Sequence, residues 1–307
     1  MWNFKSLRCI VFIFWLCRLS CSALAQESTA QVNSPEPRIS TREEIADEFK
    51  TVPCKNSDRL NAVKAFFERM GAKPEEISAE KIPGGSNLMI VKLANSTESA
   101  SEKIVIGAHL DKTSDGCGAL DNWSGITALA HVYRSVREMK LKKTVIFVAF
   151  GEEEKGMYGS AAMVDKIKKE QVPEYCAMIN IDSLGLAYPQ AADNMSSKKM
   201  MDFTADLAGK MKVPFAHAAI PGAGADSQPF LSKKIPAITL HGMTNDWPKL
   251  LHSSNDKPET VKTESVYLGY RLALALLVEV DESPCQVFRD QKESKDSKDS
   301  KITKEKQ

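Results

Sequence analysis

Residues 108–125 concentrate groups that can bind a metal ion, in the sequence AHLDKTSDGCGALDNWSG. His109 and Asp111 lie two residues apart, so on an extended chain their side chains point in the same direction. A carboxylate that accepts a hydrogen bond from one imidazole nitrogen fixes the histidine tautomer and leaves the other nitrogen free to bind a metal. A histidine at a strand end is more often a hydrogen-bonded surface residue, so this pair alone does not establish a metal site.

Asp121 and Asn122 follow a glycine-rich turn and come directly before an expected helix. Taken singly, an aspartate in this place is usually a helix N-cap or a turn former. The functional alternative is that Asp121 is a carboxylate ligand, which the turn brings close to His109. Three glycines would let the backbone turn tightly enough for this, namely Gly116, Gly118 and Gly125.

Three consecutive glutamates, residues 152–154, close the apolar run at residues 144–150. Like charges in adjacent positions repel each other, so a nearby cation would explain their presence at the end of a buried strand. The alternative is a solvated acidic loop. Two further candidate ligands follow, because Asp182 ends the apolar segment 177–182 and His252 precedes an expected helix.

Five candidate ligands therefore lie at strand ends or in loops: His109, Asp121, Glu154, Asp182 and His252. Oxygen and imidazole donors without cysteine suit zinc, cobalt or manganese. Five donors are too many for one tetrahedral site with an open position. Two metal ions that share one carboxylate are therefore the expected number.

The elements that must position these residues alternate between strand and helix along the chain. The runs 104–109, 144–150, 177–182 and 237–242 are apolar without alternation, which is typical of strands buried on both faces. Apolar residues at helical spacing or helix-like composition predict helices at 57–70, 126–139, 158–170, 198–211 and 262–279. This order predicts an α/β fold with a mixed, mostly parallel central sheet and helices on both faces. Ligands of such sheets bind beyond the carboxyl ends of the strands.

The chain of 307 residues is 43% hydrophobic and 26% charged, with a formal net charge of +1. These values predict a globular protein and indicate no nucleic-acid partner. Residues 1–25 have a basic start, an apolar run of about nine residues and a small-residue cleavage site, which predicts a signal peptide. The alternative, a membrane anchor, is disfavoured because the apolar run stops at Arg18, far short of a span.

The rest of the chain is expected to comprise a polar linker at 26–38, one domain at 39–286 and a disordered, charged tail at 287–307. A secreted or periplasmic location follows from the signal peptide, with no stable membrane insertion after its removal. Four cysteines would remain, Cys54, Cys117, Cys176 and Cys285, and they allow two disulfides in three connectivities. Pairing of Cys54 with Cys285 is attractive because it joins the two ends of the domain, but free buried thiols are an equal alternative.

Five motifs between Lys103 and Val261 together resemble the co-catalytic zinc exopeptidases of the bacterial leucyl aminopeptidase and glutamate carboxypeptidase kind, the M28 type. They are A-H-x-D, G-A-x-D-N-x-S-G, E-E-x-G-[LM]-x-G-S, N-x-D at a strand end and H-x-x-x-D. The resemblance implies two zinc ions per chain, bridged by Asp121. It implies that His109 and Asp182 complete one ion, and that Glu154 and His252 complete the other.

The same resemblance implies that Glu153 is the general base, which leaves Glu152 as an additional residue. Asp111 is expected beside His109 as a second catalytic residue. A cis peptide bond between Asp121 and Asn122 is also implied.

The expected function is hydrolysis of N-terminal residues from peptides by a secreted di-zinc aminopeptidase. Three alternatives remain: a carboxypeptidase, a single-zinc glutaminyl cyclase on the same scaffold, and a binding module that has lost its site. The oligomeric state and the preferred side chain are not specified by the sequence.

Several residues depart from the family pattern or have an open role. Trp123 replaces a small residue and is expected to alter the helix entry and the pocket wall, and the segment 225–230 (ADSQPF) lacks a usual histidine. His241 and Asp246 precede His252 and are candidates for the pocket wall, although an ordinary capped loop is the favoured interpretation.

Overall fold

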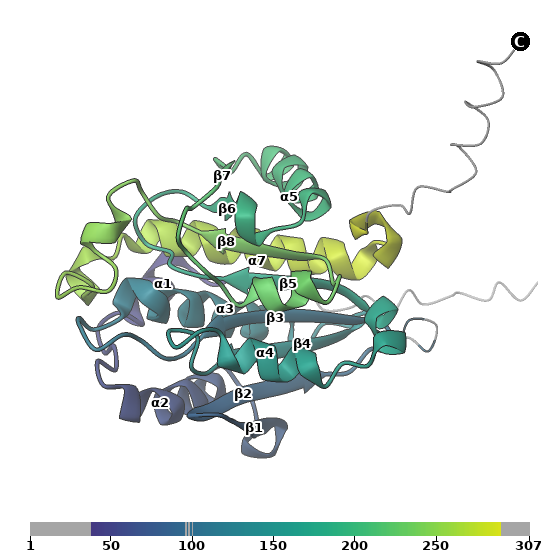
Figure 1. Cartoon of the computed structure of the whole chain (residues 1–307), viewed down its shortest axis with the longest axis horizontal. Helices are drawn as coiled ribbons and strands as arrows, with labels where there is room; N and C mark the ends of the chain where they lie inside the picture. The colour runs from purple at the N-terminus through teal and green to yellow at the C-terminus, as the bar shows by residue number, and fades with distance from the viewer. Residues whose placement is uncertain (1–37, 96, 98, 100, 290–307) are drawn as a thin grey trace, which may run out of the picture. The chain divides into compact units, whose positions relative to one another are not determined.

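The four apolar runs form the centre of an eight-stranded sheet in the computed structural model, which describes residues 38–95, 97, 99 and 101–289 (Figure 1). Strand β3 (Lys103–His109) lies between β4 (Thr144–Phe150) and β5 (Tyr175–Ile181), and β8 (Ala237–His241) lies beside β5. All three pairings are parallel. The predicted mostly parallel sheet is therefore confirmed.

Both edges of the sheet consist of strands that the sequence analysis missed. On one side β1 (Ile77–Ile82) and β2 (Gly85–Lys92) form an antiparallel hairpin whose second strand runs antiparallel to β4. On the other side β6 (Gln190–Ala192) pairs antiparallel with β8, and β7 (Ala216–Ala218) pairs with β6. β1 is largely exposed, and β6 and β7 have three residues each, so none of these carries a strong apolar pattern.

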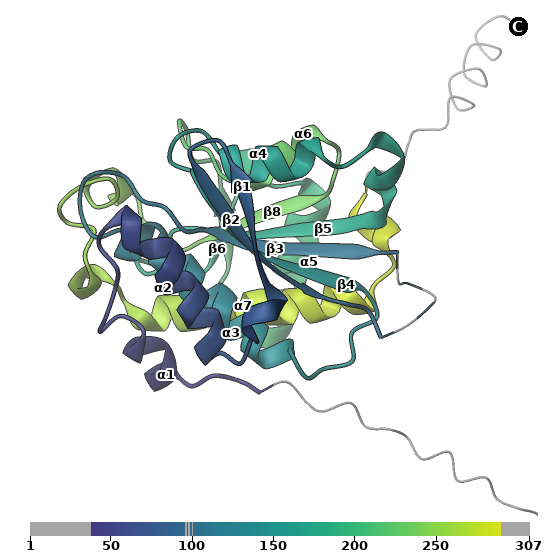
Figure 2. The same cartoon turned by 90° about the horizontal axis from the view of Figure 1, so that it is seen from below.

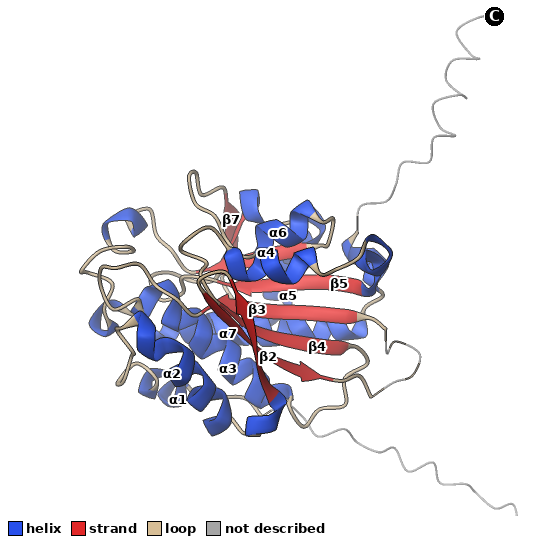
Figure 3. Ribbon diagram, turned by 60° about the horizontal axis from the view of Figure 1, so that its bottom comes forward, coloured by secondary structure: helices blue, strands red, loops and turns tan. Residues whose placement is uncertain are grey.

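Helices cover both faces of the sheet (Figures 2 and 3). α4 and α6 lie together on one face, whereas α3 and α7 pack against the opposite face. Their bounds, with those of the remaining helices, are α1 (Arg42–Asp47), α2 (Asn56–Arg69), α3 (Ser124–Val136), α4 (Tyr158–Asp165), α5 (Lys198–Met211), α6 (Ser227–Ser232) and α7 (Thr263–Glu282). The expected helix 158–170 ends early at Asp165, and a 3-10 turn that contains Pro173 follows at Lys169–Glu174.

The central strands are apolar throughout because each contributes to two cores. Along β3, Ile104 and Ile106 join the larger core on the α3–α7 side, and Val105 joins the smaller core beneath α4 and α6. All three side chains are fully buried. Such strands keep their register because a slip by one residue would move each side chain to the wrong face.

Arg59, on α2, connects the start of that helix to the loop that leads from β3 to α3. Its fully buried guanidinium donates hydrogen bonds to the carbonyls of Pro53 (3.1 Å), Leu110 (3.1 Å), Cys117 (2.8 Å) and Gly118 (2.6 Å). Burial lowers the pKa of Arg59 to about 10, so the guanidinium keeps its charge at neutral pH. This charge and its donors hold the loop between β3 and α3 in place.

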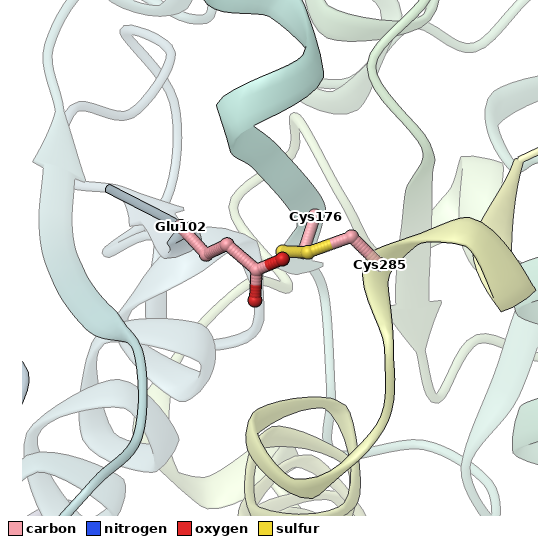
Figure 4. A group of neighbouring side chains, drawn as sticks. All are labelled: Glu102, Cys176 and Cys285. Carbon is pink, nitrogen blue, oxygen red and sulfur yellow. A yellow bond between two sulfur atoms is a disulfide. The ribbon is translucent and has the colours of Figure 1, made fainter. Parts of the chain in front are cut away.

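Two disulfides join distant segments, and neither is the pair that was favoured from the sequence. Cys54 bonds to Cys117, next to the Arg59 contacts, and Cys176 on β5 bonds to Cys285 after α7. Figure 4 shows the second disulfide with the carboxylate of Glu102 beside it. The proposed Cys54–Cys285 bond is wrong because each of these cysteines has a nearer partner in the fold.

The predicted signal peptide and most of the linker and tail lie outside the described residues. At the other end, Phe288 belongs to a short 3-10 helix (Cys285–Phe288) and is buried, although the tail was expected to start at residue 287. Within the described ranges, no helix has both the length and the apolar character needed to cross a bilayer.

His131 and Ser40 form a buried polar cluster that fastens the first described residues to α3. Ser40 Oγ lies 2.8 Å from His131 Nδ1 and accepts a hydrogen bond from Arg134 (2.5 Å). The backbone amide of Ser40 donates to the Tyr270 hydroxyl at 2.8 Å. Burial, aided by the charge of Arg134, lowers the pKa of His131 to about 3.

Replacing Arg59 by methionine should lower the free energy of unfolding by about 3 kcal/mol, because several buried carbonyls lose their donor. Arg59→Lys keeps the charge but not the planar fork, so an intermediate loss is expected. Arg69→Met on the same helix is the matched control, because that side chain is 55% exposed and its loss should cost about 1 kcal/mol or less. Urea unfolding measures all three variants, and equal losses for Arg59→Met and Arg69→Met would contradict the role of Arg59.

His131 should make the folded state less stable in acid. The pKa of His131 is lower in the folded protein than in the unfolded chain. Between about pH 3 and pH 6.5, the unfolded chain therefore binds a proton at His131 that the folded protein does not bind. Stability from this group is complete above about pH 6.5 and falls by about 1.4 kcal/mol per pH unit on the way down to about pH 3, the pKa of His131 in the folded state. Urea unfolding of His131→Gln should lose this slope while all other titrating groups remain, and an unchanged slope would disprove the assignment.

Candidate metal centre

The five predicted ligands lie together at the carboxyl ends of the parallel strands. His109 is the last residue of β3, Asp182 follows β5 and Glu154 lies just after β4. Asp121 lies in the turn before α3, and His252 comes from the long loop between β8 and α7. This is the edge at which the sequence predicted convergence.

Asp121 stands between two histidines, and each histidine also contacts a second carboxylate. His109 Nε2 lies 3.0 Å from Asp121 Oδ1 and 3.4 Å from Asp182 Oδ1. His252 Nε2 lies 3.0 Å from Asp121 Oδ2 and 3.1 Å from Glu154 Oε2. The two oxygens of Asp121 therefore face two separate groups of donors.

Asp111 supports the centre through its backbone as well as its side chain. Its carboxylate accepts hydrogen bonds from the amides of Glu153 (3.0 Å) and Glu154 (3.1 Å). His109 Nδ1 lies 3.2 Å from the Asp111 carbonyl and 3.7 Å from its carboxylate. The carbonyl, rather than the expected carboxylate, is thus the nearer group for fixing the tautomer of His109.

The backbone around Asp121 is held from two sides. Asp256 accepts hydrogen bonds from the amides of Leu120 (2.6 Å) and Asp121 (3.1 Å). Asn122 donates to the Ile181 carbonyl at 2.9 Å, which ties the turn to the end of β5. The peptide bond between Asp121 and Asn122 is cis, as the resemblance implied.

Two glycines make this turn possible. Gly118 has a φ of 61°, and a Cβ there would lie 2.7 Å from the Arg59 guanidinium. A Cβ on Gly125 would lie 2.3 Å from Asn122 Oδ1 and 2.4 Å from the Ile181 carbonyl. The first glycine allows the left-handed conformation, and the second allows α3 to approach β5.

The carboxylates strongly favour positive charge at the centre. Hydrogen bonds with Asp121 and Glu154 raise the pKa of His252 to about 10. Burial acts to lower the pKa of His109, but the charge of Asp182 and the hydrogen bonds with neighbouring aspartates outweigh it and raise this pKa well above its usual value. The centre is therefore a site with excess negative charge that suits bound cations.

Glu153 and Asp226 are two further acidic residues at this centre. Burial, together with the charges of Asp226 and Asp182, raises the pKa of Glu153 well above its ordinary value. Asp226 is fully buried, neither of its oxygens has a hydrogen-bond partner among the described residues, and burial raises its pKa to about 7. Glu152 points elsewhere, toward Lys155 Nζ at 2.6 Å.

The donor set fits divalent metal ions. Ligand atoms of His109, Asp121 and Glu154 lie within 4.8 Å of one another, and Glu154 Oε1 is buried without a hydrogen-bond partner among the described residues. Imidazole and carboxylate donors of this kind bind zinc and related ions. A second acidic and sulfur-containing group, Glu102 with Cys176 and Cys285, does not offer thiolates because its sulfurs form a disulfide.

A cavity of about 350 Å³ opens onto the centre and is lined by its residues, including Glu153 and Glu154. We call the remaining lining the pocket wall. It consists of Gly156, Met157, Ser183, Met195, residues 222–225, Thr239, His241, Met243, Trp247 and Leu251. The pocket wall is mainly apolar and contains no charged side chain among the residues that the structure describes.

The structure decides three expectations about the pocket, which concern Trp123, His241 and Asp246. Trp123 is buried, donates to the Glu48 carbonyl at 3.2 Å and is absent from the pocket lining, so the expected effect on the pocket wall is wrong. His241 ends β8 and lines the pocket, contrary to the favoured loop interpretation. Asp246 is exposed and pairs with Lys249 at 2.8 Å.

Arg59 and Asp256 are supporting residues to which the sequence analysis gave no role. Arg59 has no sequence signal, because an arginine on an amphipathic helix is normally exposed. Asp256 is the final position of the H-x-x-x-D motif, and that motif was the available signal.

Known proteins resemble this chain in sequence and in fold. Aminopeptidase YwaD of Bacillus subtilis is 22% identical over 184 residues, which cover 57% of this chain and 40% of that protein. The Legionella pneumophila LapA aminopeptidase superposes with a TM-score of 0.64 at 21% identity, covering 81% of this chain and 77% of the other. A glutaminyl cyclase from an Acidobacteriales bacterium gives a TM-score of 0.66 at 16% identity, covering 84% and 99% respectively.

At these identities the structural likenesses show a shared fold, and this chain spans 40% of the length of YwaD. The match to a family as a whole is broader. Residues 89–277, more than half of the chain, match Peptidase family M28. The order of the motifs and the convergence of their residues agree with this match, and the chain belongs to Peptidase family M28.

Proposed function

We propose that this protein is a secreted or periplasmic zinc aminopeptidase that holds two metal ions and removes N-terminal residues from peptides. His109, Asp121 and Asp182 would hold one ion. Asp121, Glu154 and His252 would hold the other. The observation that carries the proposal is the position of Asp121, whose two oxygens face two histidine–carboxylate groups at 3.0 Å each.

The metal ions and the protein side chains would contribute different parts of the reaction. Two bound divalent cations would acidify a water molecule and polarise the scissile carbonyl. Glu153 lines the pocket without contacting either histidine, so its carboxylate is free to act as a base. In this proposal Glu153 takes a proton from the attacking water and delivers it to the leaving nitrogen. Burial raises the pKa of Glu153 above its ordinary value, which makes its carboxylate a stronger base toward that water.

The pocket favours an aminopeptidase over a carboxypeptidase. A carboxypeptidase must bind the free α-carboxylate of its substrate, which arginine or lysine usually does. The pocket wall offers neither among the described residues. A free amine, in contrast, is compatible with an acidic centre. YwaD and LapA, which this chain resembles, are both aminopeptidases by name, and this also supports an aminopeptidase over a carboxypeptidase.

Glutaminyl cyclase activity is the second candidate, because this chain covers 99% of the cyclase structure but smaller shares of the aminopeptidases. Such an enzyme is expected to use one metal. The second group of donors, Glu154 and His252 around Asp121 Oδ2, is intact here and favours hydrolysis.

The compartment is proposed from the signal-like residues 1–25 and from cysteine pairing. Two disulfides are typical of proteins outside the reducing cytoplasm.

The purified, zinc-loaded protein should release leucine from leucine amide and glutamine from a peptide that begins with glutamine. Chelation should abolish both reactions, and about two equivalents of zinc should restore them. Chromatography of the products with metal analysis of the same sample measures all of this. Pyroglutamate as the main product, with about one zinc per chain, would favour the cyclase, and a protein that takes up no metal would defeat both candidates.

Glu153→Gln should lower kcat by about 10² to 10⁴-fold because the base is lost, while bound zinc and KM stay near their original values. Glu152→Gln is the matched control, since Glu152 lies in the same run but is absent from the pocket lining. Its kcat should change by less than about twofold. Steady-state kinetics with metal analysis makes the comparison, and a larger loss in Glu152→Gln would show that the assignment is displaced by one residue.

A further inference from the structure

His241 is a buried polar residue in the pocket wall for which the proposed hydrolysis has no use. It is the last residue of β8 and lies next to the end of β5, where the Gly242 amide donates to the Ser183 carbonyl at 3.0 Å. Its side chain lines the pocket, and the residue is only 4% exposed. It is not one of the five predicted ligands.

A backbone hydrogen bond determines the tautomer of His241. The amide of Met243 donates to His241 Nδ1 at 3.2 Å, so Nδ1 is an acceptor and the ring proton resides on Nε2. Nε2 is buried and has no hydrogen-bond partner among the described residues. A buried donor without a partner is costly, so a group that accepts from Nε2 would bind favourably.

The other polar side chains of the pocket wall near His241 are already engaged. Thr239 Oγ1 lies 2.7 Å from Ser227 Oγ, and Ser183 Oγ donates to Asp182 at 3.2 Å. The rest of the wall consists of methionines, Trp247, Leu251 and small residues. The thioether side chains of Met195 and Met243 are adaptable, so they can move to let a substrate reach the imidazole.

We infer that the pocket selects peptides whose N-terminal side chain is uncharged and carries an oxygen acceptor, such as asparagine or threonine, with His241 Nε2–H donating to that oxygen. This inference rests on the proposed aminopeptidase function. A charged side chain of either sign would find no counter-charge in the pocket wall. An aliphatic side chain of the same shape would leave Nε2–H unpaired.

Near-isosteric substrate pairs test this preference in the unmodified protein. Asparagine amide against leucine amide, and threonine amide against valine amide, each exchange an acceptor for an apolar group at similar volume. The zinc-loaded protein should show a kcat/KM about tenfold higher for the polar member of each pair. An equal value or a preference for the aliphatic member in both pairs would overturn the inference.

Substitution of His241 tests whether this residue is responsible. In His241→Leu the ratio of kcat/KM for asparagine amide over leucine amide should fall about tenfold. His241→Gln retains an N–H donor and should restore part of the ratio. Asp246→Asn, in the exposed part of the loop that follows β8, should leave the ratio as it is in the parent protein. A ratio in His241→Leu equal to that of the parent would refute the role of His241.

A binding measurement separates this inference from the proposed function. Titration calorimetry of the zinc-loaded protein with free asparagine and free leucine should give about tenfold tighter binding of asparagine, independent of turnover. If none of the four amides is hydrolysed, the aminopeptidase proposal is wrong. The calorimetric affinities for asparagine and leucine would then still show whether the pocket prefers a side chain with an oxygen acceptor. If His241→Leu does not fold, the calorimetric preference of the parent protein and of His241→Gln decides.

Discussion

Repulsion among buried carboxylates is the constraint on which this structure depends. The carboxyl ends of β3, β4 and β5 bring Asp121, Glu153, Glu154 and Asp182 to one rim, and the fully buried Asp226 is close enough to interact with Asp182 electrostatically. In a medium of low dielectric constant such a group cannot remain fully ionised without compensating charge. The fold supplies part of it through Arg59 and through backbone amides, which donate to Asp111 and Asp256. Divalent cations are the chemistry that would supply the rest.

The sequence predicted that most of the candidate ligands would lie close together because parallel strands end at a common rim. An apolar run without alternation predicts a buried strand, and the residue that ends it must lie at the common rim. His109 and Asp182 could be located from their own strands, whereas the choice of Glu154 within the run 152–154 came from the family resemblance. His252 has no such strand, and its assignment came from the H-x-x-x-D motif and from the family resemblance. The supporting contacts escaped prediction because they join segments more than fifty residues apart through loops, as Arg59 does with Gly118.

The backbone conformation determines which glutamates of the run 152–154 face the pocket, and the sequence of the run alone does not. β4 ends at Phe150, and Glu152 adopts a left-handed conformation with a φ of 59°. This turn directs Glu152 toward Lys155, while Glu153 and Glu154 line the pocket. The amides of the latter two are fixed by Asp111, which follows a different strand. The register of the three glutamates is thus set by a contact between two strand ends, which one segment of sequence cannot reveal.

Charge is distributed unevenly over the pocket, with a charged half at the candidate metal centre and a neutral half in the pocket wall. The charged half is built at the ends of β3, β4 and β5, together with Asp121 from the turn before α3 and His252 from the loop before α7. The neutral half is built mostly by two loops. One contains residues 222–225, and the other is the segment after β8, which contains Met243 and Trp247. Loops tolerate substitution better than buried strands do. His241 lies between these two halves, at the last position of β8. The sheet orients its imidazole ring, and the pocket wall determines which groups can contact that ring.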